Sequence, residues 1–393
     1  MSVSETIYML ENHLGGIASF CGNLISNRPP GAQQIAILLT DKTSKVVSIM
    51  EPLGAEEIRF QYLAEENVYS VLRRLAAILP RRSGAIVSNS GTELAMFSLH
   101  EPQQTVYQVV HDEYNLRLAQ TYEPIVDVFI AHSRYFVDQL RSAFPHRTEQ
   151  IFHLPYGIRL APRGRAATPG PLRLVFLGRV TEQKGALDLP EIDARLRTAG
   201  VEAYWTIIGS GSDLNTLMEQ LPPSARVRYG SPATNEEVLA LCAEGDMLIF
   251  PTRFEGFPVA LLEAMSAGLV PVVSDLPSGV PEVVTGATGF RVTIGSIDGF
   301  VGPVIELNRD RDRLEAMSRA ARARAGDFNV RDRAATYHQL FARAAELKRP
   351  WGGQLPIKLG SRLDQSYLPN GLVLATRRML ASLRRPTSIV SAL

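Results

Sequence analysis

Short apolar runs alternate with amphipathic stretches over most of this chain. The runs are rich in Val, Ile and Leu, which is typical of strands buried on both faces of a parallel sheet. In the first half of the chain we expect strands at residues 6–10, 35–40, 85–89, 105–110 and 126–131. In the second half we expect them at residues 172–177, 203–208, 227–229, 247–250 and 270–274.

Helical periodicity fills the intervals between these runs. Helices are expected at residues 65–78, 186–198, 214–220, 236–242 and 258–266. Ser90 and Glu93 have the spacing of a capping box at a helix start. Strands that alternate with helices predict an α/β fold with two doubly wound, Rossmann-like domains. Two such domains facing each other leave a central cleft at the carboxyl ends of both sheets, where ligands of these folds bind.

The pattern is interrupted at residues 155–171, where Pro, Gly, Arg and Ala dominate. Such a segment indicates an interdomain linker. We therefore expect a first domain at residues 1–160, a second at residues 171–330, and C-terminal helices with a tail at residues 331–393.

The C-terminal part contains two helical patterns separated by a Pro/Gly break at residues 350–353. The first, at residues 330–347, is amphipathic. The second lies within residues 372–383, and one of its faces carries Leu372, Ala375, Met379 and Leu383.

Composition agrees with a globular protein, since 45% of the residues are hydrophobic and 21% are charged. Two cysteines, Cys21 and Cys242, form neither a disulfide framework nor a metal-binding spacing, which suits a reducing compartment. The first five residues lack the basic start of a signal peptide, and no apolar run approaches the roughly 20 residues that span a bilayer. These features predict a cytoplasmic protein.

Charge is distributed unevenly along the chain. Residues 348–393 contain eight basic residues and one acid, a net charge of +7, so the rest of the chain sums to −6 against a total of +1. A basic tail on a mildly acidic body indicates an anionic surface or an acidic partner, and the sequence suits peripheral membrane contact or a helix packed on the first domain equally well. The body offers no basic stripe interleaved with aromatics, so we expect no nucleic-acid partner.

The segment at residues 254–265 carries the first candidate chemistry. It follows an expected strand and leads through Gly256 and Pro258 into an expected helix, an arrangement that offers free N–H groups to an anion. Glu255 and Glu263 can accept hydrogen bonds from sugar or ribose hydroxyls. Two glutamates at this spacing occur by chance about once in such a chain, so the surrounding residues carry the prediction.

A pair of cations provides the second candidate feature. Arg179 follows the end of an expected strand, and Lys184 comes five residues later across a short loop. Two cations at the carboxyl end of a strand can neutralise a diphosphate leaving group.

Together these motifs resemble the retaining GT-B glycosyltransferases of family 4, the glycosyl transferases group 1. The resemblance rests on the Glu-x7-Glu segment with its continuation at residues 266–275 and 279–282, and on the Gly-Arg…Lys-Gly motif at residues 178–185. It implies transfer of a hexosyl unit from a nucleoside diphosphate sugar to an acceptor hydroxyl, with retained configuration. The first domain would be the acceptor side, the second would bind the donor, and the C-terminal helices would cross back to the first domain.

The resemblance also implies roles for individual residues. Arg179 and Lys184 would hold the leaving pyrophosphate, and Glu263 the ribose hydroxyls. Glu255 and the neighbouring backbone amides would hold the donor hexose, and Gly256, Phe257 and Pro258 would line this donor site. The remaining implied site residues are His111 at a strand end against the donor sugar, the loop glycines Gly15 and Gly16 facing the donor phosphate, and Gly209 near the nucleotide base.

Some features depart from the family or leave alternatives open. Tyr156 stands where the family often has Asn, and Arg253 has no assigned role. Asp310 and Asp312 imitate a metal motif but lie in an Arg-rich helical stretch, so we expect no metal and no other cofactor. The alternative functions are an epimerase or phosphorylase of the same shape, or a non-catalytic sugar-nucleotide-binding subunit. The sugar, the base, the acceptor and the oligomeric state cannot be read from the sequence.

Overall fold

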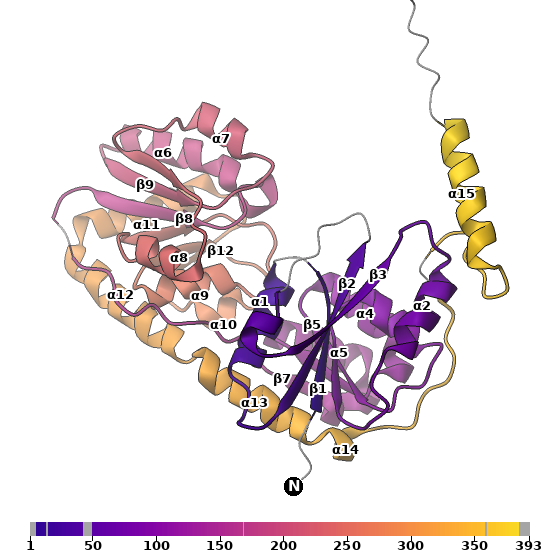
Figure 1. Ribbon diagram of the computed structural model, residues 1–393. Coiled ribbons are helices and arrows are strands. Elements are labelled where there is room, and N and C mark those ends of the chain that lie inside the picture. Colours follow the sequence, from indigo (N-terminus) through magenta and orange to yellow (C-terminus); the bar gives the residue numbers. More distant parts are fainter. Residues whose placement is uncertain (1–4, 13–14, 42–48, 168, 358–359, 385–393) are drawn as a thin grey trace, which may run out of the picture.

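The computed structural model describes residues 5–12, 15–41, 49–167, 169–357 and 360–384. Figure 1 shows two lobes, each built around a parallel sheet with helices on its faces, and a run of C-terminal helices that passes from one lobe to the other. Every strand pair in both sheets is parallel, as expected for strands connected by helical crossovers.

The first sheet has seven strands in the order β3-β2-β1-β4-β5-β6-β7. The strands are β1 (Glu5–Glu11), β2 (Gln33–Asp41), β3 (Glu56–Tyr62), β4 (Ala85–Ser88), β5 (Thr105–Val110), β6 (Val128–Ala131) and β7 (Ile151–His153). The α-helices around it are α1 (Gly16–Ser26), α2 (Val68–Ala77), α3 (Gly91–Phe97), α4 (Glu113–Tyr122) and α5 (Arg134–Ala143). The expected capping interaction is present at α3, because the buried Glu93 carboxylate accepts hydrogen bonds from the N–H groups of Asn89 and Ser90.

The second sheet has six strands in the order β10-β9-β8-β11-β12-β13. The strands are β8 (Leu172–Leu177), β9 (Ala203–Ile208), β10 (Val227–Gly230), β11 (Met247–Phe250), β12 (Val270–Ser274) and β13 (Phe290–Val292). Its α-helices are α6 (Leu189–Thr198), α7 (Leu214–Gln220), α8 (Asn235–Cys242), α9 (Val259–Ser266), α10 (Val280–Val283), α11 (Ile297–Arg309) and α12 (Arg311–Gly326).

The C-terminal helices return to the first lobe, as expected. Helix α13 (Val330–Ala342) packs on α1, and α14 (Ala344–Leu347) lies at the amino end of β5. The hydroxyl of Tyr107 in β5 donates to the Leu340 carbonyl at 3.1 Å, and His338 hydrogen-bonds the Leu24 carbonyl at 2.9 Å. The last helix, α15 (Asn370–Arg384), projects from the first lobe beside α2.

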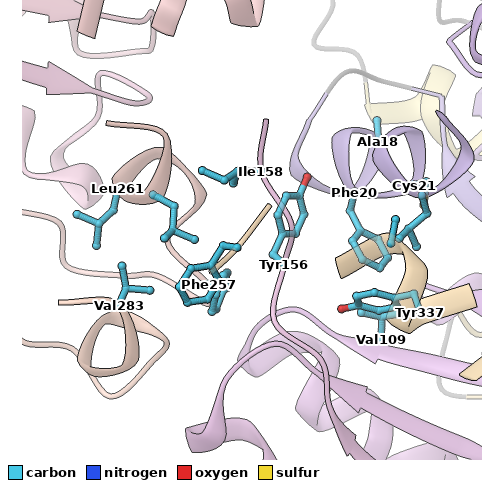
Figure 2. Close-up of a cluster of buried hydrophobic side chains, with 14 of the residues drawn as sticks. Ala18, Phe20, Cys21, Val109, Tyr156, Ile158, Phe257, Leu261, Val283 and Tyr337 are labelled. Atoms are coloured by element: carbon cyan, nitrogen blue, oxygen red, sulfur yellow. The ribbon is translucent and has the colours of Figure 1, made fainter. Parts of the chain in front are cut away.

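One apolar cluster continues from the first lobe into the second. Figure 2 shows Tyr156 of the linker between Phe20 of α1 on one side and Phe257 and Leu261 on the other. All four side chains belong to the same buried cluster. The two lobes therefore share apolar surface beside the linker, and their carboxyl strand ends are held close together.

Candidate functional site

The loop between β11 and α9 contains Thr252 and Glu255, the first glutamate of the Glu-x7-Glu segment. Thr252 is fully buried, and its hydroxyl donates to Oε1 of Glu255 and to the Phe254 carbonyl, both at 3.1 Å. These bonds turn the Glu255 carboxylate back toward the end of β11. Thr252 therefore orients the glutamate.

Lys184 reaches the same carboxylate from another loop. Its ammonium donates to Oε1 of Glu255 at 2.6 Å and to the Phe254 carbonyl at 2.9 Å. The turn that carries the lysine requires a glycine, because Gly185 has a φ of +71° and a methyl group there would lie 2.0 Å from the Pro251 carbonyl oxygen. The Lys-Gly motif thus lets the backbones of two loops approach closely. This approach brings the Lys184 ammonium within hydrogen-bonding distance of the Glu255 carboxylate.

Arg253 closes the same junction from outside. Its guanidinium pairs with Asp188 at 2.9 Å and donates to the Glu182 carbonyl at 3.2 Å, while its N–H donates to the Gln183 carbonyl. The sequence left Arg253 without a role. In the structure it clamps the Lys184 loop onto the loop that follows β11.

Arg179 is exposed just after β8. Its guanidinium makes no hydrogen bond or ion pair with the residues that the structure describes. Its charge nevertheless acts on Glu255: burial raises the pKa of that carboxyl, and Lys184, Thr252 and Arg179 oppose the rise. The site therefore holds one cation that is already paired and one that is available to an anion.

Glu263 lies on α9, separated from this cation cluster. Its Oε1 accepts a hydrogen bond from the Asn235 amide at 2.6 Å. Burial raises the pKa of Glu263 to about 7, and the Asn235 bond only partly offsets that effect. A buried carboxyl with one donor has spare acceptor capacity, which suits the predicted contact with ribose hydroxyls. Asn235 was missed in the sequence because it begins a helix without belonging to a motif.

A cavity of about 490 Å³ lies beside Glu263, between the lobes. Five segments line it: α1, the stretch before β3, the linker, α8 and α9. The lining residues are Gly16, Ala18, Ser19, Gly22, Asn23, Ile49, Met50, Leu53, Tyr156, Ile158, Arg159, Asn235, Val259, Ala260 and Glu263. The cavity has an apolar wall with a few polar groups, the usual form of a small-molecule site.

The predicted glycines Gly15, Gly16 and Gly209 lie in different parts of the structure. Gly16 begins α1 and lines the cavity, while Gly15 is the N-cap of that helix. The adjoining residues 13 and 14 lie outside the described residues. Gly209, at the end of β9, has a φ of +137°, and a methyl group there would lie 2.0 Å from the Gly178 carbonyl oxygen. Gly209 therefore serves a close backbone approach beside Arg179, and it is absent from the cavity lining.

Gly256 brings the donor-side loop against the first lobe. A methyl group at Gly256 would lie 1.8 Å from the carbonyl oxygen of His111. The N–H groups of Gly256 and Phe257 donate to no group among the described residues. Pro258 is the N-cap residue of α9 instead of its first residue, so the amides of Gly256 and Phe257 lie just before that helix. The loop before α9 therefore offers two N–H groups where it touches the first lobe.

His111 follows β5 at the cleft, as expected, and its ring belongs to a hydrogen-bonded chain. Nε2 lies 2.9 Å from Oδ1 of Asn89, and Nδ1 lies 3.1 Å from Nε2 of His132. Nδ1 of His132 in turn lies 2.9 Å from the hydroxyl of Tyr337. Asp112, the neighbour of His111, caps α4 instead of contacting the ring.

The partners fix the tautomers of this chain. The Asn89 amide nitrogen donates to the Met9 carbonyl, so Oδ1 of Asn89 must accept a hydrogen bond from Nε2–H of His111. Nδ1 of His111 then accepts from Nε2–H of His132, and the Tyr337 hydroxyl, which donates to the Leu154 carbonyl, lies 2.9 Å from Nδ1 of His132. Burial lowers the pKa of His111 well below its usual value and that of His132 to about 4, which keeps both rings neutral. His132, at the carboxyl end of β6, therefore determines the orientation of His111.

The remaining motif residue lies away from this site. Asp310 accepts a hydrogen bond from the N–H of Arg313 as the N-cap of α12. In the described part of the chain, no group of three or more His, Cys, Asp or Glu side chains could hold a metal ion.

This chain is similar to known proteins in sequence and in fold. Residues 162–324 match the family model described as glycosyl transferases group 1. The chain is 33% identical over 213 residues to the putative colanic acid biosynthesis glycosyltransferase WcaL of Salmonella typhimurium. That match covers 51% of this chain and 48% of the relative, so this chain spans about half the length of that protein.

A longer match is more distant. The GDP-mannose-dependent monoacylated alpha-(1-6)-phosphatidylinositol monomannoside mannosyltransferase of Corynebacterium glutamicum is 25% identical over 365 residues, covering 82% of this chain and 94% of that relative. Among solved structures, the apo form of the lipopolysaccharide outer core galactosyltransferase WaaB has a TM-score of 0.66 at 18% identity, covering 86% of this chain and 99% of that structure. This likeness confirms the expected GT-B architecture.

Proposed function

Because residues 162–324 match the family model described as glycosyl transferases group 1 and the chain has the GT-B fold, we propose that it is a retaining hexosyltransferase. It would move a hexosyl unit from a nucleoside diphosphate sugar to an acceptor hydroxyl. The observation that carries this proposal is the convergence of Lys184, Arg179 and Glu255 beside unbonded loop amides. The Corynebacterium relative is named as dependent on GDP-mannose, a donor of this class.

In the proposed reaction the pyrophosphate binds between Arg179, Lys184 and the amides at the start of α9. The bond from the anomeric carbon to the pyrophosphate oxygen breaks, and the acceptor oxygen bonds to the same carbon on the same face. The acceptor proton passes to the departing phosphate oxygen. Retention by double displacement would need a carboxylate beneath the anomeric carbon. Glu255 is a poor candidate for that nucleophile, because its Oε1 is already bound by Lys184 and Thr252.

We further propose that this chemistry requires no metal ion and takes place in the cytoplasm. The two cations and the helix dipole of α9 would stabilise the developing charge that a divalent cation stabilises in other transferases. The two cysteines are free and buried, which suits a reducing compartment.

A donor screen tests the proposal. UDP-, GDP- and ADP-sugars are each added to the protein, and the shift of its melting temperature is measured. The donor that raises it most is then incubated with acceptor alcohols, with and without EDTA. We expect release of the nucleoside diphosphate only when the acceptor is present, equal rates in EDTA, and an α-linked product from an α-linked donor. Donor turnover without acceptor would favour an epimerase, release of sugar phosphate a phosphorylase, and binding without turnover a non-catalytic subunit.

A further inference from the structure

The C-terminal segment carries a helix with apolar residues exposed to solvent. Of the large hydrophobic side chains, Tyr367 is 77% exposed, Leu372 55%, Met379 57% and Leu380 42%. Elsewhere in the described residues, only Tyr114, Tyr204 and Ile294 are comparably exposed, and they are scattered singly. A group of large apolar side chains on one surface element marks an interaction site more often than isolated ones do.

Polar contacts hold this helix in a fixed position. The Asn67 side chain, at the N-cap of α2, donates to the Leu368 carbonyl at 2.7 Å, and its N–H donates to Oδ1 of Asn370 at 2.8 Å. The buried Asp364 carboxylate accepts from the Val68 N–H at 2.8 Å. Helix α15 is thus fastened to the start of α2 by its first turn, and Figure 1 shows the rest of it extending outward.

Arg377, within α15, adds further polar contacts that hold the helix in place. Its guanidinium donates to the carbonyls of Glu65 and Glu66, both at 2.8 Å, and pairs with Asp364 at 2.5 Å. Val373, on the same side of the helix, is 1% exposed. The sequence left open whether the helix packs on the first domain with its arginines in solvent. In the structure one arginine faces the protein, and apolar side chains face solvent.

The charge of the helix indicates what it contacts. Residues 370–384 contain Arg377, Arg378 and Arg384 and no acidic residue, and Arg385 follows. On a helical wheel, Leu372 and Met379 share the centre of one face, and Arg377 and Arg378 lie about 110 to 150° away, one on either side. A second copy of the helix would bring like charges together. A face of leucine and methionine flanked by arginines suits an interface of acyl chains and anionic headgroups.

We propose that α15 is a membrane-surface helix, which binds the anionic face of a lipid bilayer through Tyr367, Leu372 and Leu380 with Arg378 at the headgroups. The residues that hold α15 lie beyond the carboxyl end of β3. Helix α1 begins at the same edge of the first sheet, after the carboxyl end of β1. A bilayer bound there lies on the side of the first lobe that is expected to receive the acceptor. The inference does not depend on the proposed transfer reaction.

Vesicle sedimentation with the full chain and no nucleotide sugar tests it. Vesicles of phosphatidylcholine alone are compared with vesicles in which about one third of the lipid is phosphatidylglycerol. We expect the protein to sediment with the anionic vesicles only, and to be released at about 0.5 M salt. The double variant Leu372→Glu/Leu380→Glu should bind at least tenfold more weakly.

The matched control is Tyr204→Glu/Ile294→Glu, which places the same charges on exposed apolar positions of the other lobe. It should bind as the unchanged protein does. Equal binding by the α15 variant and the control would overturn the proposal, as would failure of the unchanged protein to bind. Size-exclusion chromatography over a range of concentrations provides a second readout. A dimer that the α15 substitutions abolish would mean that a second copy covers this helix.

Discussion

The ammonium nitrogen of Lys184 lies 2.6 Å from Oε1 of Glu255, and both side chains are largely buried. They come from two loops of the same sheet that meet through Gly185 and Pro251. In the proposed reaction a donor diphosphate would enter a site whose lysine already has an anionic partner. We infer that Lys184 is held ready by Glu255 and shared with the phosphate when the donor binds, so that little reorganisation accompanies the reaction.

Lys184→Ala should lower turnover by about two to three orders of magnitude, because the leaving pyrophosphate loses a preorganised cation. Initial rates of nucleoside diphosphate release measure this, with circular dichroism to check the fold. The control Arg228→Ala removes an exposed cation that pairs with Glu244 on the surface of the same lobe. It should change the rate by less than about twofold. A Lys184→Ala rate as high as that of the control would contradict the assignment.

Glu263 predicts a pH dependence of donor binding. Its pKa of about 7 means that much of the carboxyl is protonated at pH 6 and ionised at pH 8. If only the ionised form accepts both ribose hydroxyls, donor affinity rises about tenfold between these values. Titration calorimetry across this range measures the change. Glu263→Gln should bind weakly with no such pH dependence, and a rise of the same size in that variant would assign the titration to another group.

The same pKa has a consequence for stability. A carboxyl whose pKa is higher in the folded than in the unfolded protein favours folding less as pH rises from about 4.5 to about 7. Burial of the charged form then costs up to about 3 kcal/mol above that range. Without donor, Glu263→Gln should melt at a higher temperature than the unchanged protein at pH 8, and the difference should shrink toward pH 5. A pH-independent difference would argue against a raised pKa.

Gly256 tests whether the approach of the two lobes matters for the reaction. In Gly256→Ala the new methyl group would overlap the His111 carbonyl oxygen, so either the loop or the lobe must move. We expect kcat/KM for the donor to fall by about 10- to 100-fold, since small displacements of reacting groups are costly. Gly302→Ala in α11 is the matched control, because a methyl group there meets nothing within 4 Å. Equal activity of the two variants would show that the contact is dispensable.

Buried strands were predicted well from the sequence because their signal is local. The bounds of β5, β8, β9, β11 and β12 agree with those expected from apolar runs. Strand β3 was missed, since it is a partly exposed edge strand in which charged residues alternate with apolar ones. Strands β7 and β13 have three residues each and are too short for a periodic pattern. The expected helix at 330–347 is interrupted at Arg343, which ends α13.

The residues of the candidate site also differ in whether a local sequence pattern marks them. Lys184, Glu255 and Glu263 belong to motifs, and the sequence was sufficient to nominate them. Asn235 and His132 act through contacts with residues far away in the chain, so no local pattern marks them. For His132 a weak signal existed, because it directly follows β6 at the carboxyl edge where ligands bind.

His132 is therefore the subject of the last prediction, as a positioning residue for His111. His132→Phe removes the donor to Nδ1 of His111, while Oδ1 of Asn89 still accepts from Nε2–H, so the ring keeps its tautomer but loses one of its two anchors. We expect kcat to fall about tenfold with little change in KM for the donor, because ring orientation affects the reacting groups more than binding. The ¹⁵N chemical shift of Nδ1 of His111 should move to that of a nitrogen that accepts no hydrogen bond, while Nε2 stays protonated.

His132→Gln, whose amide can donate to the same nitrogen, should recover much of the rate. Tyr337→Phe removes the hydroxyl at the far end of the chain and leaves the His132–His111 bond in place, so it should keep the His111 tautomer. Burial keeps both imidazoles neutral from pH 6 to 8. The pH dependence assigned to Glu263 should therefore persist in each of these variants. Unchanged ¹⁵N shifts together with a lowered kcat in His132→Phe would mean that His132 acts by packing, because Phe257 lies against its ring.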